Sequence, residues 1–225
     1  IRDAVEEGRG VYDNIVKFIT WTLPTNISEA GVVLLALIFG VAAPIQPLQI
    51  LWINTVTAVL LGLMLAFEPK EPGLMTLRPR DADEALIAPN MLKYVLVVGL
   101  LLILSVFFVY ERSVLHFDNL AVAQTASVNA IVFGEMFYLI NVRSFRSDLR
   151  NIGFFSNKRL LGGIAVMAGL QIIFTNAGFM NRIFGTAPIS MAAWLYILMA
   201  SFIIFLIVEL MKWYDRYSVK SDNGA

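Results

Sequence analysis

Residues 23–67 read LPTNISEAGVVLLALIFGVAAPIQPLQILWINTVTAVLLGLMLAF, which is two apolar runs separated by one short break. A helix needs about 20 mostly apolar residues to cross the hydrocarbon core of a bilayer, and each run is long enough. The break around Pro44–Pro47 leaves room only for a tight turn at one membrane face. We therefore predict two spanning helices, over 18–43 and 47–67, that form an antiparallel hairpin.

Four more apolar runs of similar length follow the hairpin, at 91–110, 121–142, 160–178 and 191–211. Of the 225 residues, 58% are hydrophobic and 15% are charged, against roughly 45–50% and about 25% in soluble domains. The mean hydropathy is +0.73. The sequence therefore predicts an all-α integral membrane protein, a six-transmembrane-helix bundle with lipid as its surroundings, and excludes an ordinary soluble enzyme.

The counts of charged and metal-binding residues exclude further classes. Seventeen basic residues balance seventeen acidic ones, so no global field attracts a polyanion, and we expect no nucleic-acid partner. The chain has no cysteine and a single histidine, His116. Thiolate metal sites, cysteine nucleophiles and histidine clusters are thereby excluded.

The two ends of the chain are polar. Residues 1–17 have helical periodicity, which predicts a stalk that extends the first spanning helix into the cytoplasm. The membrane domain is predicted over 18–217, and residues 218–225 form a cytoplasmic tail. A chain that begins IRDAVEEGRG, already helical and without an initiator Met, is expected to be a piece of a longer protein.

The distribution of lysine and arginine predicts the orientation. With six spans, fifteen of the seventeen basic residues fall on the side that holds both termini, and only Arg112 and Arg182 fall on the other. Basic residues accumulate on the cytoplasmic side of membrane proteins. Both termini are therefore predicted to be cytoplasmic.

Five polar residues are predicted to lie deep in the membrane: Asn26, Glu29, Asn54, Thr57 and Glu135. The pairs Asn26/Glu29 and Asn54/Thr57 are each spaced by three, so each pair shares one face of its helix. The short hairpin places the two pairs at comparable depth. Asn and Thr are common interhelical hydrogen-bonding residues, and that structural interpretation stays open for Asn54 and Thr57.

The carboxylates are harder to explain structurally, because a charged side chain near the bilayer centre costs at least about 2.5–3.5 kcal/mol. Carboxylate, amide and hydroxyl oxygens are ligands for hard cations such as Ca²⁺ or Na⁺, and carboxylates also carry protons. The five residues therefore predict a site for a transported cation, which can be Ca²⁺, a monovalent ion or a proton.

Four segments carry a family resemblance: AVEEGRGVYDNIVKFI (4–19), LPTNISE (23–29), QILWINTVTAVLLGLMLAFEP (49–69) and PGLMTLRPRD (72–81). In this order they resemble the C-terminal membrane region of P-type cation-transporting ATPases of the calcium-pump group. The resemblance implies that the spans are helices five to ten of ten. It also implies that Asn26 and Glu29, Asn54 and Thr57, and Glu135 are the ligands from helices five, six and eight.

The resemblance further implies that the phosphorylation, nucleotide and actuator domains and helices one to four, with their ATP and Mg²⁺, lie outside this chain. The chain by itself would then have no catalytic residues. Calcium pumps have an Asp directly after the helix-six Thr, whereas this chain has Ala58. Similar helix-six sequences occur in bacterial members, so a bacterial plasma membrane is expected. The alternative is a self-contained six-helix ion or proton carrier or channel.

Overall fold

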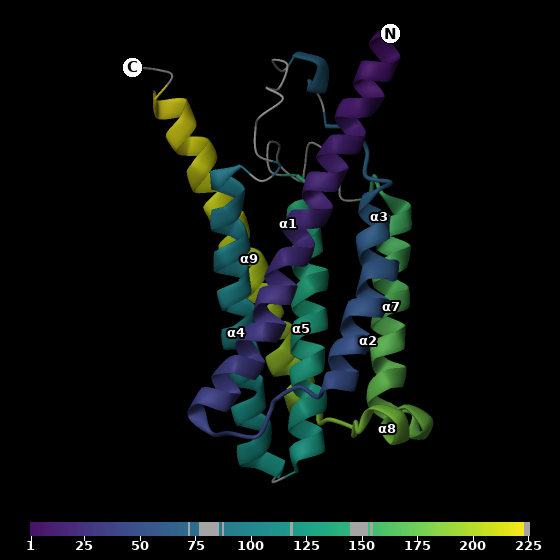
Figure 1. Ribbon diagram of the computed structural model, residues 1–225, viewed down its shortest axis with the longest axis vertical. Helices are drawn as coiled ribbons and strands as arrows, with labels where there is room; N and C mark the ends of the chain where they lie inside the picture. Colours follow the sequence, from purple (N-terminus) through teal and green to yellow (C-terminus); the bar gives the residue numbers. More distant parts are fainter. Residues whose placement is uncertain are drawn as a thin grey trace.

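The computed structural model describes residues 1–71, 73–76, 86, 88–117, 119–144, 153 and 155–222. Within these ranges the regular structure is entirely helical. In this described part of the chain, six helices are long and apolar enough to cross a membrane, which confirms the predicted all-α bundle. The helices α1 and α9 project beyond the same end of the bundle (Figure 1), here called the terminal face; the other end is the opposite face. Much of the loop predicted after the second span, and 223–225 of the tail, lie outside the described residues.

The first helix, α1 (Arg2–Phe39), includes both the predicted stalk and the first span, and it continues through Pro24. It ends at Phe39 and not at residue 43, because Gly40 adopts a left-handed conformation with φ 65°. Glycine takes this conformation without the steric cost that a Cβ imposes. The backbone N–H of Gly40 is bonded to the last turn of the helix, and the link to the next span starts there.

The second span contains three consecutive helical pieces: α2 (Pro47–Thr57), a π-helical turn η1 (Ala58–Gly62) and α3 (Leu63–Leu65). Pro47 occupies the first helical position, where its missing N–H is not needed. A short 3₁₀ turn, η2 (Leu74–Thr76), follows near the terminal face. The π-turn η1 is a wider turn directly after Thr57, and it was not predicted from the sequence.

The remaining spans are α4 (Pro89–Phe117), α5 (Leu120–Val142), α7 (Lys158–Asn176) and α9 (Met191–Asp222). A short helix, α8 (Gly178–Phe184), follows α7 and lies across the opposite face (Figure 1). The centre of the bundle is α5, which contacts α1, α2, α4, α7 and α9. Most of its side chains are buried, including that of Glu135.

Close backbone approach holds the second span against α7. A Cβ at Gly163 of α7 would overlap the carbonyl oxygen of Leu60 in the π-turn. In lipid, helices associate largely through van der Waals packing, which small residues at the interface allow. Gly163 therefore lets α7 seat directly on the π-turn that follows Thr57 in the sequence.

Candidate functional site

Glu29 lies in the middle of the spanning part of α1 and is only 5% exposed. Its Oε2 accepts a hydrogen bond from Nδ2 of Asn54 on α2 at 2.7 Å. Hydrogen bonds to a charged acceptor are shorter and stronger than those between neutral groups. This bond joins the two helices of the hairpin at one depth and orients the carboxylate toward α2.

Glu135 reaches the same region from α5 and is 2% exposed. Its carboxylate is close enough to that of Glu29 for the two like charges to interact, and it is near the hydroxyl groups of Thr25 and Thr57. Thr57 is itself buried. Three helices, α1, α2 and α5, thus direct oxygen-bearing side chains toward one place inside the bundle.

Some of these side-chain oxygens can still accept a hydrogen bond or bind a cation. Among the described residues, Oε1 of Glu29 and Oε2 of Glu135 are buried without a hydrogen-bond partner. A buried polar atom without a partner is costly, more so inside a membrane where no bulk water can reach it. The two carboxylates also repel each other when both are charged. Binding a cation, or a proton on one carboxylate, relieves both costs.

Asn26 is placed differently from the other four predicted residues. It is exposed, whereas Glu29 and Thr57 are buried and Asn54 is half-buried. Asn26 and Glu29 line an open groove of about 450 Å³ along α1, with Ile50 of α2 contributing to the wall. The structure therefore brings four of the five together and leaves Asn26 at the side of the groove.

Two contributors to this region were not predicted from the sequence. Thr25 adjoins Asn26 but projects toward Glu135, and a lone threonine beside a proline gives no signal in the sequence. The π-turn at Ala58–Gly62 begins directly after Thr57. Such turns are frequent at functional sites. Among the described residues no group of three or more Asp, Glu, His or Cys side chains could hold a metal ion, so the candidate site is limited to two carboxylates with neutral oxygens.

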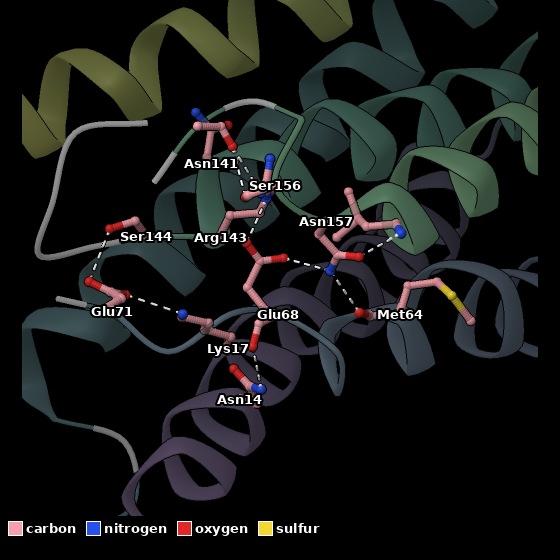
Figure 2. Close-up of polar contacts among 12 residues, drawn as sticks. Asn14, Lys17, Met64, Glu68, Glu71, Asn141, Arg143, Ser144, Ser156 and Asn157 are labelled. Atoms are coloured by element: carbon pink, nitrogen blue, oxygen red, sulfur yellow. Dashed lines mark hydrogen bonds and ion pairs between the residues drawn. The ribbon is translucent and has the colours of Figure 1, made fainter. Parts of the chain in front are cut away.

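A second polar cluster lies at the terminal face (Figure 2). Glu68, just after α3, accepts a hydrogen bond at Oε1 from Nε of Arg143 at 2.8 Å and one at Oε2 from Nδ2 of Asn157 at 2.8 Å. Asn157 also caps α7 by accepting from the backbone N–H of Leu160. Arg143 donates further to Oγ of Ser156 at 2.6 Å. The end of the second span is thereby fastened to α5 and α7.

The stalk part of α1 joins the same region through Lys17. Its Nζ lies 3.2 Å from Oε1 of Glu71, and both side chains are 5% exposed. The other carboxylate oxygen of Glu71 accepts from Oγ of Ser144 at 3.1 Å (Figure 2). Nearer the N-terminus, the hydrogen bond from Lys70 to Glu7 at 2.6 Å raises the pKa of Lys70. Stalk, loop and α5 are therefore tied together.

Comparisons with known proteins cover almost the whole chain. The family model described as "Cation transporting ATPase, C-terminus" matches residues 42–214. The chain is 45% identical over 208 residues to the "Probable cation-transporting ATPase F" of Mycobacterium tuberculosis, covering 92% of this chain and 23% of that protein. It is 36% identical over 202 residues to the "Cation-transporting ATPase pma1" of Synechocystis, covering 86% of this chain and 22% of that protein.

A third relative, the "Calcium-transporting ATPase 1" of Bacillus cereus, is 30% identical over 224 residues, covering 93% of this chain and 25% of that protein. The chain spans about a quarter of the length of the curated relatives it matches.

Proposed function

Because this chain belongs to the cation-transporting ATPases and matches their C-terminal region, we propose that it supplies the cation site of an ATP-driven pump. In this proposal Glu29, Asn54, Thr57 and Glu135 provide oxygen ligands from the first, second and fourth spans, and Asn26 joins them from the side of the groove. ATP hydrolysis, with its Mg²⁺, takes place in parts of the pump that precede this chain.

The observation that carries the proposal is the Glu29–Asn54 contact. A carboxylate buried in the middle of a span accepts a hydrogen bond at 2.7 Å from an amide on the neighbouring helix, and it is close enough to a second buried carboxylate for their charges to interact. One oxygen of each carboxylate has no partner among the described residues. Intramembrane ionisable residues mark ion and proton paths, and this pair has the chemistry to bind a hard cation.

The charge of the site limits what it binds. Two carboxylates neutralise one divalent ion, and Ala58 adds no oxygen where an acidic residue would supply a third charge. We therefore infer that one divalent ion, a monovalent ion or a proton is carried in each cycle. Calcium is one candidate, since the relative from Bacillus cereus is named as calcium-transporting. The relatives from Mycobacterium and Synechocystis are named only as cation-transporting.

The stalk would couple this site to the ATP-hydrolysing parts. Residues 2–17 and the rest of α1 form one uninterrupted helix that contains Glu29, so a displacement of the stalk moves the carboxylate. By sequence, fifteen of the seventeen basic residues fall in the segments on the side of the two termini, which supports an orientation with both termini in the cytoplasm. The bacterial relatives support a plasma-membrane location.

The proposal is tested by Glu29→Gln in the intact pump, assayed for cation-stimulated ATP hydrolysis. Glutamine preserves the size of the side chain and the bond from Asn54 but removes the charge, so stimulation by the transported cation should be lost. The control is Glu111→Gln, because Glu111 is an exposed carboxylate of α4. Equal stimulation in the Glu29 variant, the control variant and the parent would overturn the proposal.

A further inference from the structure

The short helix α8 (Gly178–Phe184) begins two residues after α7 ends. The 19 residues of α7 extend about 28 Å at 1.5 Å per residue, close to the roughly 30 Å of the hydrocarbon core. The chain therefore reaches the membrane boundary near Asn176. From there α8 turns across the opposite face and does not continue along the bundle (Figure 1).

One side of α8 is apolar and uncovered. Phe179 and Ile183 are 58% and 56% exposed, and their spacing of four places them on the same side of the helix. Arg182, also exposed, is beside them. Arg182 is one of two basic residues in the segments predicted to face the side opposite the termini. A short helix with an apolar side and a flanking arginine is typical of helices that lie in the membrane interface.

The inner side of α8 is held firmly to the bundle. The ring of Phe184 packs against Trp52 of α2 and Phe174 of α7, with centroid distances of 5.2 and 5.4 Å. The carbonyl oxygen of Phe184 accepts a hydrogen bond from Nε2 of Gln49 at 3.0 Å. Thr186, just after the helix, donates to the carbonyl oxygen of Phe174 at 2.9 Å. Phe179 and Ile183 are therefore exposed even though the helix that carries them is firmly docked on the bundle.

We propose that α8 is an interfacial anchor whose partner is the phospholipid leaflet at the opposite face. Phe179 and Ile183 enter the boundary between headgroups and acyl chains, and Arg182 lies at the level of the lipid phosphates. The leaflet is the partner because α8 continues directly from a spanning helix at the depth where the hydrocarbon core ends. This proposal does not depend on the cation site.

The anchor has a consequence for the second span. Gln49 and Trp52 of α2 contact Phe184, and Asn54 lies two residues further along the same helix. The depth at which α8 lies in the leaflet therefore sets the depth of the N-terminal end of α2, which lies at the opposite face.

The test uses single cysteines in a version of the intact pump without other cysteines, labelled with a small polarity-sensitive fluorophore and reconstituted in phosphatidylcholine and phosphatidylglycerol vesicles. The labelled positions are Phe179→Cys and Ile183→Cys. The matched control is Gly178→Cys on the same helix, rotated about 100° from Phe179; a Cβ there meets nothing within 4 Å. Quenching is measured with a nitroxide near the top of the lipid acyl chain and with iodide in water.

The nitroxide lipid should quench the labels at 179 and 183 about twofold more than the label at 178. Iodide should show the reverse order. The proposal is overturned if iodide quenches the labels at 179 and 183 as strongly as the label at 178, or if neither of them responds to the nitroxide lipid. Two independent positions on the apolar side ensure that a folding defect in one variant does not decide the outcome.

Discussion

Glu68 and Arg143 are 75 residues apart in the sequence, and their side chains meet at 2.8 Å with no more than 1% of either exposed. The pair fastens the end of the second span to the end of α5, at the terminal face and away from Glu29. Removing one partner of a buried ion pair leaves an uncompensated charge, which is far more costly than losing an exposed pair.

Glu68→Gln should therefore destabilise the protein strongly. The carboxylate of Glu68 accepts from Arg143 with one oxygen and from Asn157 with the other. A glutamine side chain has a single accepting oxygen, so it cannot make both bonds in this geometry. The expected loss is about 3–5 kcal/mol, measured as a lower thermal unfolding midpoint of the detergent-purified pump. Glu7→Gln removes an exposed partner of Lys70 and should leave the midpoint almost unchanged. Similar midpoints for the two variants would contradict a structural role for the buried pair.

Gly163→Ala should also destabilise the fold, because its methyl group would overlap the carbonyl oxygen of Leu60. Overpacking of this kind typically costs about 1–3 kcal/mol. The neighbouring Gly162 is a matched control, since a Cβ there has nothing within 4 Å. Gly162→Ala should be neutral or stabilise by up to about 1 kcal/mol, as alanine favours the helix. Equal effects on the unfolding midpoint would show that α7 does not seat on the π-turn.

Ala58→Asp should raise the affinity of the pump for divalent cations. Position 58 directly follows Thr57, begins the π-turn and is half-buried. A third carboxylate there increases ligand charge, which governs affinity for hard cations. We expect the concentration of Ca²⁺ that half-stimulates ATP hydrolysis to fall about tenfold, equivalent to roughly 1.4 kcal/mol. Leu63→Asp, one π-turn away and exposed, is the control. An unchanged Ca²⁺ response in the Ala58 variant would place this residue outside the site.

The orientation can be checked with cysteines at two exposed positions, Pro188 at the opposite face and Glu7 in the stalk. An impermeant thiol reagent added to intact cells should label Pro188→Cys and spare Glu7→Cys. Both should react after the cells are permeabilised. Labelling of Glu7→Cys in intact cells would reverse the orientation inferred from the basic residues.

The sequence by itself determined the class of fold, because the length of the apolar runs and the position of the breaks between them are both local properties. The length of each apolar run predicts a span, and the break near Pro44 requires a hairpin. The cost of a carboxylate in lipid is likewise evident at Glu29 and Glu135 without a structure. Four segments were enough to indicate the family, and the match over residues 42–214 shows it.

Tertiary structure decided which polar groups meet, because that depends on how each helix is rotated about its axis. Periodicity places Asn26 and Glu29 on one face, yet Glu29 is buried against Asn54 while Asn26 is exposed. Thr25 joins the site, and Glu68 pairs with Arg143, through contacts between distant segments that composition does not encode. The π-turn and α8 also depend on packing. The carbonyl group of Leu60 has room in the π-turn because Gly163 of α7 has no side chain. The ring of Phe184 holds α8 in place by packing against Trp52 and Phe174.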